Sequence, residues 1–221
     1  MSVFVIGPKD KNFSKTAKVI NVTSTSDTWS KDLSPFFLGP VNIPASPTSK
    51  MLELIDKKIA HEKEDKLQNL IKLKEKLTGN IQSFNVENAW QFSKVYDRFD
   101  DNGTPTKEWF TWRFNGLTSK KAIRYPMGKN AKPKYSWWNS QALNYIEARK
   151  QIYIPLYSNA VRNTLAFSRL MGLKSATDVI LWDFDGYNHN EFYMSYDDVI
   201  NCETKKMVHA FVLAMMLEGI L

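Results

Sequence analysis

Residues 178–191 read DVILWDFDGYNHNE, an apolar run that leads directly into two aspartates one residue apart. The first five residues are typical of a short buried strand, because most are branched or aromatic and a turn signal follows them. No helical or strand period accounts for the residues after Trp182. We therefore expect a strand whose end carries Asp183 and Asp185, with Gly186 letting the chain turn sharply over a ligand. The alternative is an acidic turn that caps the next helix.

Two further strands are expected in the first forty residues, where SVFVIG (2–7) and AKVINVTST (17–25) are rich in β-forming side chains. The segment LSPFFLGPVNIP (33–44) carries prolines and a glycine around an aromatic pair, which indicates a structured loop. Most of the remaining chain has helical spacing. The predicted fold class is therefore α+β and predominantly α-helical, and the length of 221 residues fits one compact domain over 1–221.

A helical insertion is expected over 48–79, where apolar residues recur at helical spacing among alternating charges. Thr48 or Ser49 can cap its start, and Gly79 ends it. The pattern fits one long helix or a two-helix hairpin, and the polar middle AHEKEDK (60–66) predicts that the segment protrudes. The apolar stripe indicates packing rather than function and comprises Leu52, Ile55, Ile59, Leu67, Leu70, Ile71 and Leu77.

Another helix is expected over NVENAWQFSKVYD (85–97), with Asn85 as its cap. Its inward face is assigned to Val86 and to Trp90 or Ala89. Glu87 falls in the first turn, where the helix dipole favours an ionised carboxylate. An acid at a helix start is an ordinary structural feature, and a catalytic carboxylate is the alternative.

Two more helical regions are expected in the last third of the chain. Residues 140–172 read as helix with a break near Pro155, because proline has no amide hydrogen to donate. Residues 201–221 read as an amphipathic to fully apolar helix. His209 within it is interpreted as a core histidine rather than a metal ligand.

The charge of the chain favours polyanionic partners, since 30 Lys and Arg against 23 Asp and Glu give a net charge of +7. The segment KKAIRYPMGKNAKPK (120–134) holds six basic residues and no acid, and the aromatic YSWW (135–138) follows it. Such a loop suits phosphates and stacked bases. A solvated loop that keeps the protein in solution is the alternative. Tyr125, Trp137 and Trp138 would be exposed in the first case and could be core residues in the second.

Composition excludes several classes of protein. Cys202 is the one cysteine, so an internal disulfide is impossible, and a buried structural thiol is expected with a nucleophile as the alternative. The start MSVFVIGPKDK lacks the pattern of a secretory signal, and no apolar run approaches the roughly 18 residues of a membrane span. We expect a cytoplasmic protein with no membrane partner.

Carboxylates are the remaining route to catalysis. The three histidines and Cys202 are scattered, and glycine-rich nucleotide-binding patterns and a Ser-x-Gly elbow are missing, so neither a metal nor a cofactor is expected. Cleavage of a glycosidic bond needs one group that handles protons and one anion that stabilises an oxocarbenium-like centre. The candidates are Glu87, Asp183 and Asp185.

Five segments in order resemble the NADAR family, also called YbiA-like: LSPFFLGP (33–40), VENAWQFSKVY (86–96), YSWW (135–138), YIEARKQIYIPLYSNAV (145–161) and LWDFDGYNH (181–189). The resemblance covers roughly residues 30–190. Glu87, Gln91 and Lys94 reproduce the spacing of the E-H-x-x-Q-x-x-K motif of that family, with Asn88 in place of the histidine. The last segment departs from the family's D-x-x-W-G turn, which leaves open whether Asp183 or Asp185 corresponds. Region 48–79 is an insertion relative to compact members.

The resemblance implies a NADAR-like domain with N-glycosidase activity on a ribosyl linkage. Members are similar to enzymes that remove ADP-ribose from guanine in nucleic acid, or that hydrolyse phosphorylated riboflavin-pathway intermediates. A small metabolite needs one or two basic contacts, whereas six basic residues within 120–134 suit ADP-ribosylated DNA. The alternatives are a non-catalytic basic and aromatic nucleic-acid-binding module and a glycosidase acting on a small phosphorylated metabolite.

In this hypothesis Glu87 is the principal catalytic carboxylate, and Asp185 or Asp183 is its partner across one pocket. Trp138, or less favourably Trp137, stacks on the base. Lys94, Arg124 and Lys129 neutralise phosphates. The remaining candidates for substrate contact are Asn88, Gln91, Phe37 and Tyr187.

Overall fold

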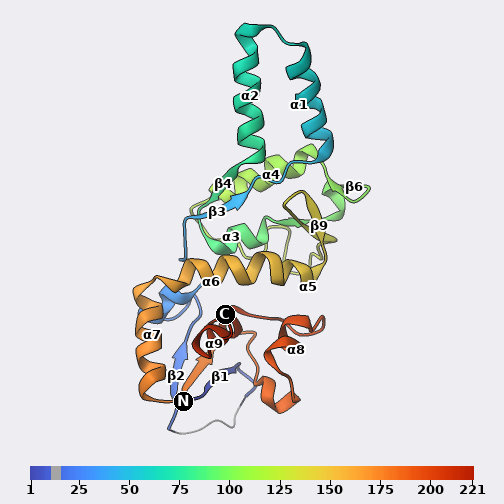
Figure 1. Ribbon diagram of the computed structural model, residues 1–221. Helices are drawn as coiled ribbons and strands as arrows, with labels where there is room; N and C mark the ends of the chain where they lie inside the picture. Colours follow the sequence, from blue (N-terminus) through green and yellow to red (C-terminus); the bar gives the residue numbers. More distant parts are fainter. Residues whose placement is uncertain (11–15) are drawn as a thin grey trace. The chain divides into compact units, whose positions relative to one another are not determined.

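Strand β10 (Val179–Trp182) is the central strand of a parallel sheet, as expected from the apolar run before the two aspartates. The structure is a computed structural model that describes residues 1–10 and 16–221. Strands β1 (Val3–Ile6) and β2 (Lys18–Asn21) flank β10 and run parallel to it (Figure 1). The three strand predictions are confirmed. A strand with a neighbour on each side is well shielded from water, and Ile180 is 0% exposed.

Helix α9 (His209–Leu217) contacts β1 and β10 of this sheet. All nine of its residues are buried. A helix that is apolar on all sides belongs in a core, so the apolar part of the helix predicted over 201–221 is confirmed, whereas residues 202–208 are not helical. The shorter helical turns of the same region are η1 (Trp29–Leu33), η4 (His189–Phe192) and α8 (Tyr196–Asn201).

The predicted break at Pro155 is wrong, because helical structure continues through this residue. Helix α5 (Tyr145–Ala148) passes into a π-helical segment, η3 (Arg149–Tyr153), and then into α6 (Ile154–Arg162). A π-helical segment changes the spacing of the hydrogen-bond ladder, which accommodates a proline that has no amide hydrogen. The helix ends instead at Arg162, and α7 (Leu165–Ala176) begins after a short turn.

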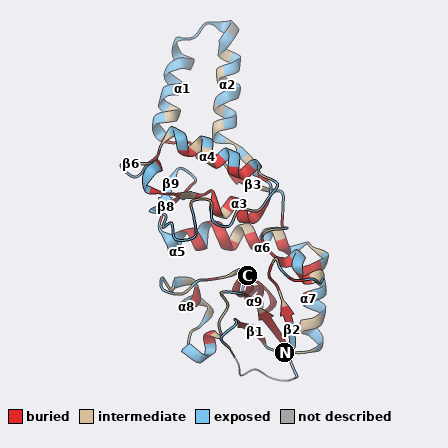
Figure 2. Cartoon of the chain, turned by 180° about the vertical axis from the view of Figure 1, so that it is seen from behind, coloured by how far each residue is buried: buried red, intermediate tan, exposed pale blue. Residues whose placement is uncertain are grey.

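A helical hairpin is inserted between two paired strands. Strand β3 (Val41–Pro44) pairs antiparallel with β4 (Asn80–Ser83), and α1 (Ser49–His61) and α2 (Glu64–Thr78) connect them. The two helices run side by side, and most of their surface is exposed (Figures 1 and 2). The two-helix form of the prediction is confirmed, as is Thr48 as the cap of the first helix.

The helix that carries Glu87, α3 (Val86–Gln91), ends earlier than the predicted helix over 85–97, because the chain turns into strand β5 (Lys94–Val95). Strand β5 forms an antiparallel sheet with β8 (Tyr135–Trp138) and β9 (Gln141–Leu143). Between β5 and β8 lies α4 (Lys107–Thr118). Beside it are η2 (Asp97–Phe99), β6 (Asp100–Asp101) and β7 (Thr104–Pro105). A hydrophobic cluster holds these elements together and consists of Val95, Tyr96, Phe99, Trp109 and Trp137.

The described chain divides into two compact units. The terminal unit comprises Met1–Gly39 and Tyr145–Leu221, and the central unit comprises Pro40–Asn144. With 47% helix and 15% strand, the fold is α+β and mainly helical, as predicted. The division into compact units does not test whether residues 1–221 form one domain, so that assignment stays a prediction. Among the described helices, none combines the length and hydrophobicity that crossing a bilayer requires.

Candidate active site

A chain of three polar side chains extends from Glu87 at the start of α3. Glu87 is 6% exposed, and its Oε1 accepts a hydrogen bond from Gln91 Nε2 at 3.0 Å. Gln91 Oε1 accepts in turn from Lys94 Nζ at 2.7 Å. This orientation of the amide suits both neighbours, because its NH₂ group faces the carboxylate and its carbonyl faces the ammonium. Gln91 therefore fixes the carboxylate and connects it to a cation.

Helical spacing explains why these residues meet. Glu87 and Gln91 are four residues apart on α3, so their side chains lie on one face of the helix. Lys94 lies beyond the helix end, in β5, and its ammonium reaches back to Gln91. Asn85 Oδ1 caps the helix by accepting from the Asn88 amide at 2.8 Å. Trp109 Nε1 donates to the Lys94 carbonyl at 2.9 Å, which fixes the backbone where the chain leaves the helix.

Lys94 is a poorly hydrated cation. Burial of the ammonium lowers the pKa of Lys94 from its ordinary value of 10.5 to about 8, although the Glu87 carboxylate opposes this effect. The Lys94 Nζ atom also lies 4.8 Å from the centroid of the Trp90 ring. The side chain is therefore mostly charged at pH 7 and can contact a phosphate, but it loses its proton in mildly alkaline solution.

The sequence predicts Trp90 on the inward face of the helix, with Ala89 as the alternative. The structure buries Ala89 completely and leaves Trp90 partly exposed. Trp90 thus lies beside Lys94 as an accessible indole, which the sequence analysis did not assign to the site. Trp90 is three residues from Glu87, and this spacing could have predicted its place near the site, because residues three apart share a helix face.

The predicted base-stacking tryptophans are interior residues. Trp137 is 5% exposed, packs in the hydrophobic cluster and donates through Nε1 to the Ser46 carbonyl at 2.6 Å. Trp138 is 6% exposed. Indoles buried to this extent do not offer a ring face to a base, so the core alternative describes them better. Tyr125, by contrast, is 43% exposed.

The basic residues 120–134 lie on a loop without helix or strand, and Arg124 and Lys129 are exposed as predicted for phosphate contacts. The Arg124 guanidinium is stacked over the Tyr125 ring at 5.3 Å. Lys134 differs from them, because its Nζ pairs with Asp100 Oδ2 at 2.6 Å. Asn88, predicted to contact substrate, is 0% exposed, and its side chain binds the backbone of this loop instead.

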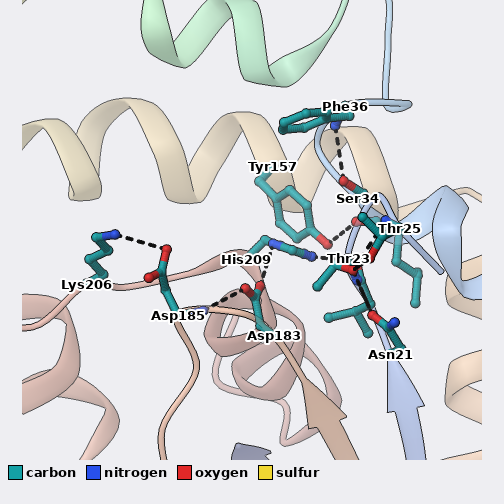
Figure 3. Close-up of polar contacts among 12 residues, drawn as sticks. Asn21, Thr23, Thr25, Ser34, Phe36, Tyr157, Asp183, Asp185, Lys206 and His209 are labelled. Atoms are coloured by element: carbon teal, nitrogen blue, oxygen red, sulfur yellow. Dashed lines mark hydrogen bonds and ion pairs between the residues drawn. The ribbon is translucent and has the colours of Figure 1, made fainter. Parts of the chain in front are cut away.

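In the terminal unit, Asp183 is a buried residue that contacts His209. Its Oδ2 lies 3.0 Å from His209 Nδ1, and the other ring nitrogen, Nε2, contacts the Val22 carbonyl at 2.8 Å (Figure 3). Asp183 and His209 are 5% and 7% exposed. The pair joins the end of β10, the start of α9 and the residue after β2. The expectation of a core histidine is confirmed, and Asp183 has a structural role as its partner.

Asp185 is the more accessible of the two aspartates. Its side chain is 30% exposed and pairs with Lys206 Nζ at 3.0 Å (Figure 3). The sharp turn after it depends on a close approach, because a β-carbon on Gly186 would lie 2.3 Å from the Ile6 carbonyl oxygen. This space restriction, rather than a left-handed backbone, requires glycine at position 186.

The other predicted contacts in this unit differ in exposure. Phe37 is 49% exposed, and the Lys31 ammonium lies 4.7 Å from its ring centroid. Tyr187 is partly buried, and burial is the main cause that raises the pKa of its hydroxyl to about 12. Cys202 is partly rather than fully buried, and the Thr204 hydroxyl lowers the pKa of its thiol. No three His, Cys, Asp or Glu side chains in the described residues could together hold a metal ion.

The structure brings Glu87, Gln91 and Lys94 together within the central unit. Asp183 and Asp185 lie in the terminal unit, so their predicted pairing with Glu87 joins residues of different units and stays a prediction. Comparisons with protein-family models, curated proteins and solved structures found no match for this chain. The NADAR resemblance therefore depends on the sequence segments alone.

Proposed function

We propose that this chain is an N-glycosidase of the NADAR type that removes ADP-ribose from a nucleobase, with guanine in DNA as the favoured substrate. The observation that carries the proposal is the buried Glu87 carboxylate, held by Gln91 and linked through it to Lys94. A carboxylate with little access to water, fixed by a neighbouring amide, is suited to stabilise positive charge or to take a proton from water.

In the proposed reaction, a water oxygen attacks the anomeric carbon of the ribose as the bond to the base nitrogen breaks. The base leaves with the bonding electron pair and takes up a proton. Glu87 accepts the proton of the attacking water or stabilises the developing oxocarbenium charge. Lys94 supplies a positive charge for a phosphate of the ADP-ribose moiety, and the partly exposed Trp90 offers an aromatic ring beside it.

Of the two aspartates, Asp185 is the better candidate for contact with a sugar. Asp183 is committed to His209 in the interior, whereas the Asp185 side chain is partly open to solvent. A requirement for Asp185 in the same reaction is tested by the activity of an Asp185→Asn variant.

The alternatives make different predictions. A non-catalytic nucleic-acid-binding module was inferred from a basic loop together with exposed tryptophans, and the burial of Trp137 and Trp138 removes part of its support. A glycosidase for a small phosphorylated metabolite would use few of the exposed cations of the loop.

The test is to incubate the protein with an oligonucleotide carrying ADP-ribosylated guanine and to measure free ADP-ribose by mass spectrometry. The proposal predicts that one ADP-ribose is released per modified guanine, and that unmodified DNA slows this release by competing for the protein. Release that excess unmodified DNA does not slow would favour the small-metabolite glycosidase. Salt-sensitive binding without release of ADP-ribose would favour the binding module.

A further inference from the structure

The loop over residues 119–134, here called the basic loop, is fixed to helix α3 by one buried side chain. Asn88 Nδ2 donates to the carbonyls of Ser119 and Lys121 at 2.9 and 3.1 Å. Asn88 Oδ1 accepts from the Ile123 amide at 2.8 Å. Asn88 is 0% exposed and follows Glu87 directly in the chain. The start of the loop is therefore held in a defined position relative to Glu87.

The middle and the end of the basic loop are also anchored. Met127 packs against the hydrophobic cluster of the central unit. The Lys134 amide donates to the Val95 carbonyl at 2.8 Å, and the Lys134 ammonium pairs with Asp100. Tyr135 donates its hydroxyl hydrogen to the same carboxylate at 2.7 Å. A loop fixed at its start, middle and end loses little further conformational freedom when it binds a ligand.

Between these anchors the loop presents cations to solvent. No acidic residue occurs over 119–134. The exposed basic side chains are Lys120, Lys121, Arg124, Lys129 and Lys132. The exposed Tyr125 ring lies among them, with the Arg124 guanidinium over one face. Repeated positive charges around an accessible aromatic ring match the backbone and bases of a nucleic acid strand better than a ligand with one or two phosphates.

We propose that the basic loop binds the phosphate backbone of a nucleic acid strand and that Asn88 is the positioning residue that holds this surface in register with Glu87. The proposal builds on the proposed function, since it names the class of substrate that the Glu87 site receives. Asn88 acts through the loop and does not itself touch substrate, because its side chain is buried and bonded to loop backbone.

The first test measures binding of an unmodified, fluorescently labelled single-stranded oligonucleotide at several salt concentrations. Each phosphate contact contributes about 0.7 to the slope of log affinity against log salt, so a Lys129→Ala/Lys132→Ala double variant should lower that slope by about 1.4. The matched control is Lys58→Ala/Lys63→Ala, which removes the same charge from the exposed hairpin. If both double variants change binding equally, the loop is not the binding surface.

The second test releases the loop without removing a cation. Asn88→Asp keeps the size of the side chain but places an oxygen against the two loop carbonyls, and it should weaken binding about 10-fold or more. Ile123→Pro leaves Asn88 intact but removes the Ile123 amide hydrogen that Asn88 Oδ1 accepts, so this variant should also weaken binding. Circular dichroism identifies any variant that fails to fold, and the other variant then decides. Wild-type affinity in a folded variant would overturn the role of Asn88.

These outcomes are independent of the glycosidase proposal, because unmodified DNA is bound and not cleaved. Binding that follows the predictions without release of ADP-ribose would refute the proposed function and leave the binding surface intact. Release of ADP-ribose with unchanged binding in every variant would do the reverse.

Discussion

Replacing Lys94 by Met should remove the contribution that this lysine makes to the pH dependence of stability. In the folded protein the pKa of Lys94 is lowered by burial from 10.5 to about 8. At pH values between these two, the unfolded chain holds a proton that the folded chain has lost. The contribution of Lys94 to the free energy of unfolding therefore rises with pH across this window, and below pH 8 the full penalty for burying the ammonium is present.

The size of the effect follows from the two pKa values. The whole change from 10.5 to about 8 corresponds to about 3 kcal/mol. Raising the pH from 7 to 9.5 recovers about 2 kcal/mol of it, because the unfolded lysine is still mostly protonated at the upper value. The Met variant has no proton to release at this position. The difference in unfolding free energy between wild type and variant should therefore change by about 2 kcal/mol in favour of the wild type.

The assay is urea unfolding followed by tryptophan fluorescence at pH 7 and pH 9.5. Contributions from tyrosines and from Cys202 cancel, because both proteins contain them. Lys132→Met removes an exposed lysine of the basic loop and should retain the wild-type pH dependence. A difference between wild type and Lys94→Met that stays constant within about 0.5 kcal/mol, or that moves against the wild type, would refute the assignment of Lys94 as a buried cation.

Three further predictions concern the site and its support. The KM for a phosphorylated substrate should rise above pH 8 in the wild type as Lys94 loses its proton, but not in Lys94→Arg, and initial rates from pH 7 to 9.5 measure this. Asp183→Ala should destabilise the fold by about 3 kcal/mol or more, whereas Asp185→Ala should change stability by less than about 1 kcal/mol; equal losses in urea unfolding would contradict the assigned roles. Gly186→Ala, whose β-carbon meets the backbone of β1, should lower stability by about 1–3 kcal/mol in urea unfolding. Gly172→Ala, whose β-carbon meets nothing within 4 Å, should raise stability in the same assay.

Local patterns predicted the three strands of the parallel sheet and several helices. They missed the antiparallel strands, since β3 lies in the segment 33–44 that was expected to be a loop and β9 lies in the segment 140–172 that was expected to be helix. The stripe over 48–79 specified a hairpin, because its apolar residues follow helical spacing and its middle is polar. The run before Asp183 specified a strand, because most of its residues are branched or aromatic and a turn signal follows them. Pro155 was misjudged, because the π-helical segment that accommodates it is not visible as a pattern of residue types. Local sequence also could not show that the chain divides into two compact units.

The site was predictable where it depends on spacing and unpredictable where it depends on tertiary contacts. Glu87, Gln91 and Lys94 meet because of their separation along one segment. The exposure of Trp90 and the burial of Trp137 depend on which elements pack around them, which composition does not reveal. Equally, the interaction of Asp183 with a histidine 26 residues later depends on how α9 packs on the sheet.

The most direct test of the central claim compares Glu87→Gln with Glu108→Gln in the release of ADP-ribose from a modified oligonucleotide. Both glutamates lie in the first turn of a helix, but Glu108 is exposed, so the pair separates a buried catalytic carboxylate from a helix-start acid. Glu87→Gln should lower kcat by about 100-fold or more while oligonucleotide affinity stays within about threefold, and Glu108→Gln should match the wild type. Release of ADP-ribose by Glu87→Gln at the wild-type rate would contradict the account.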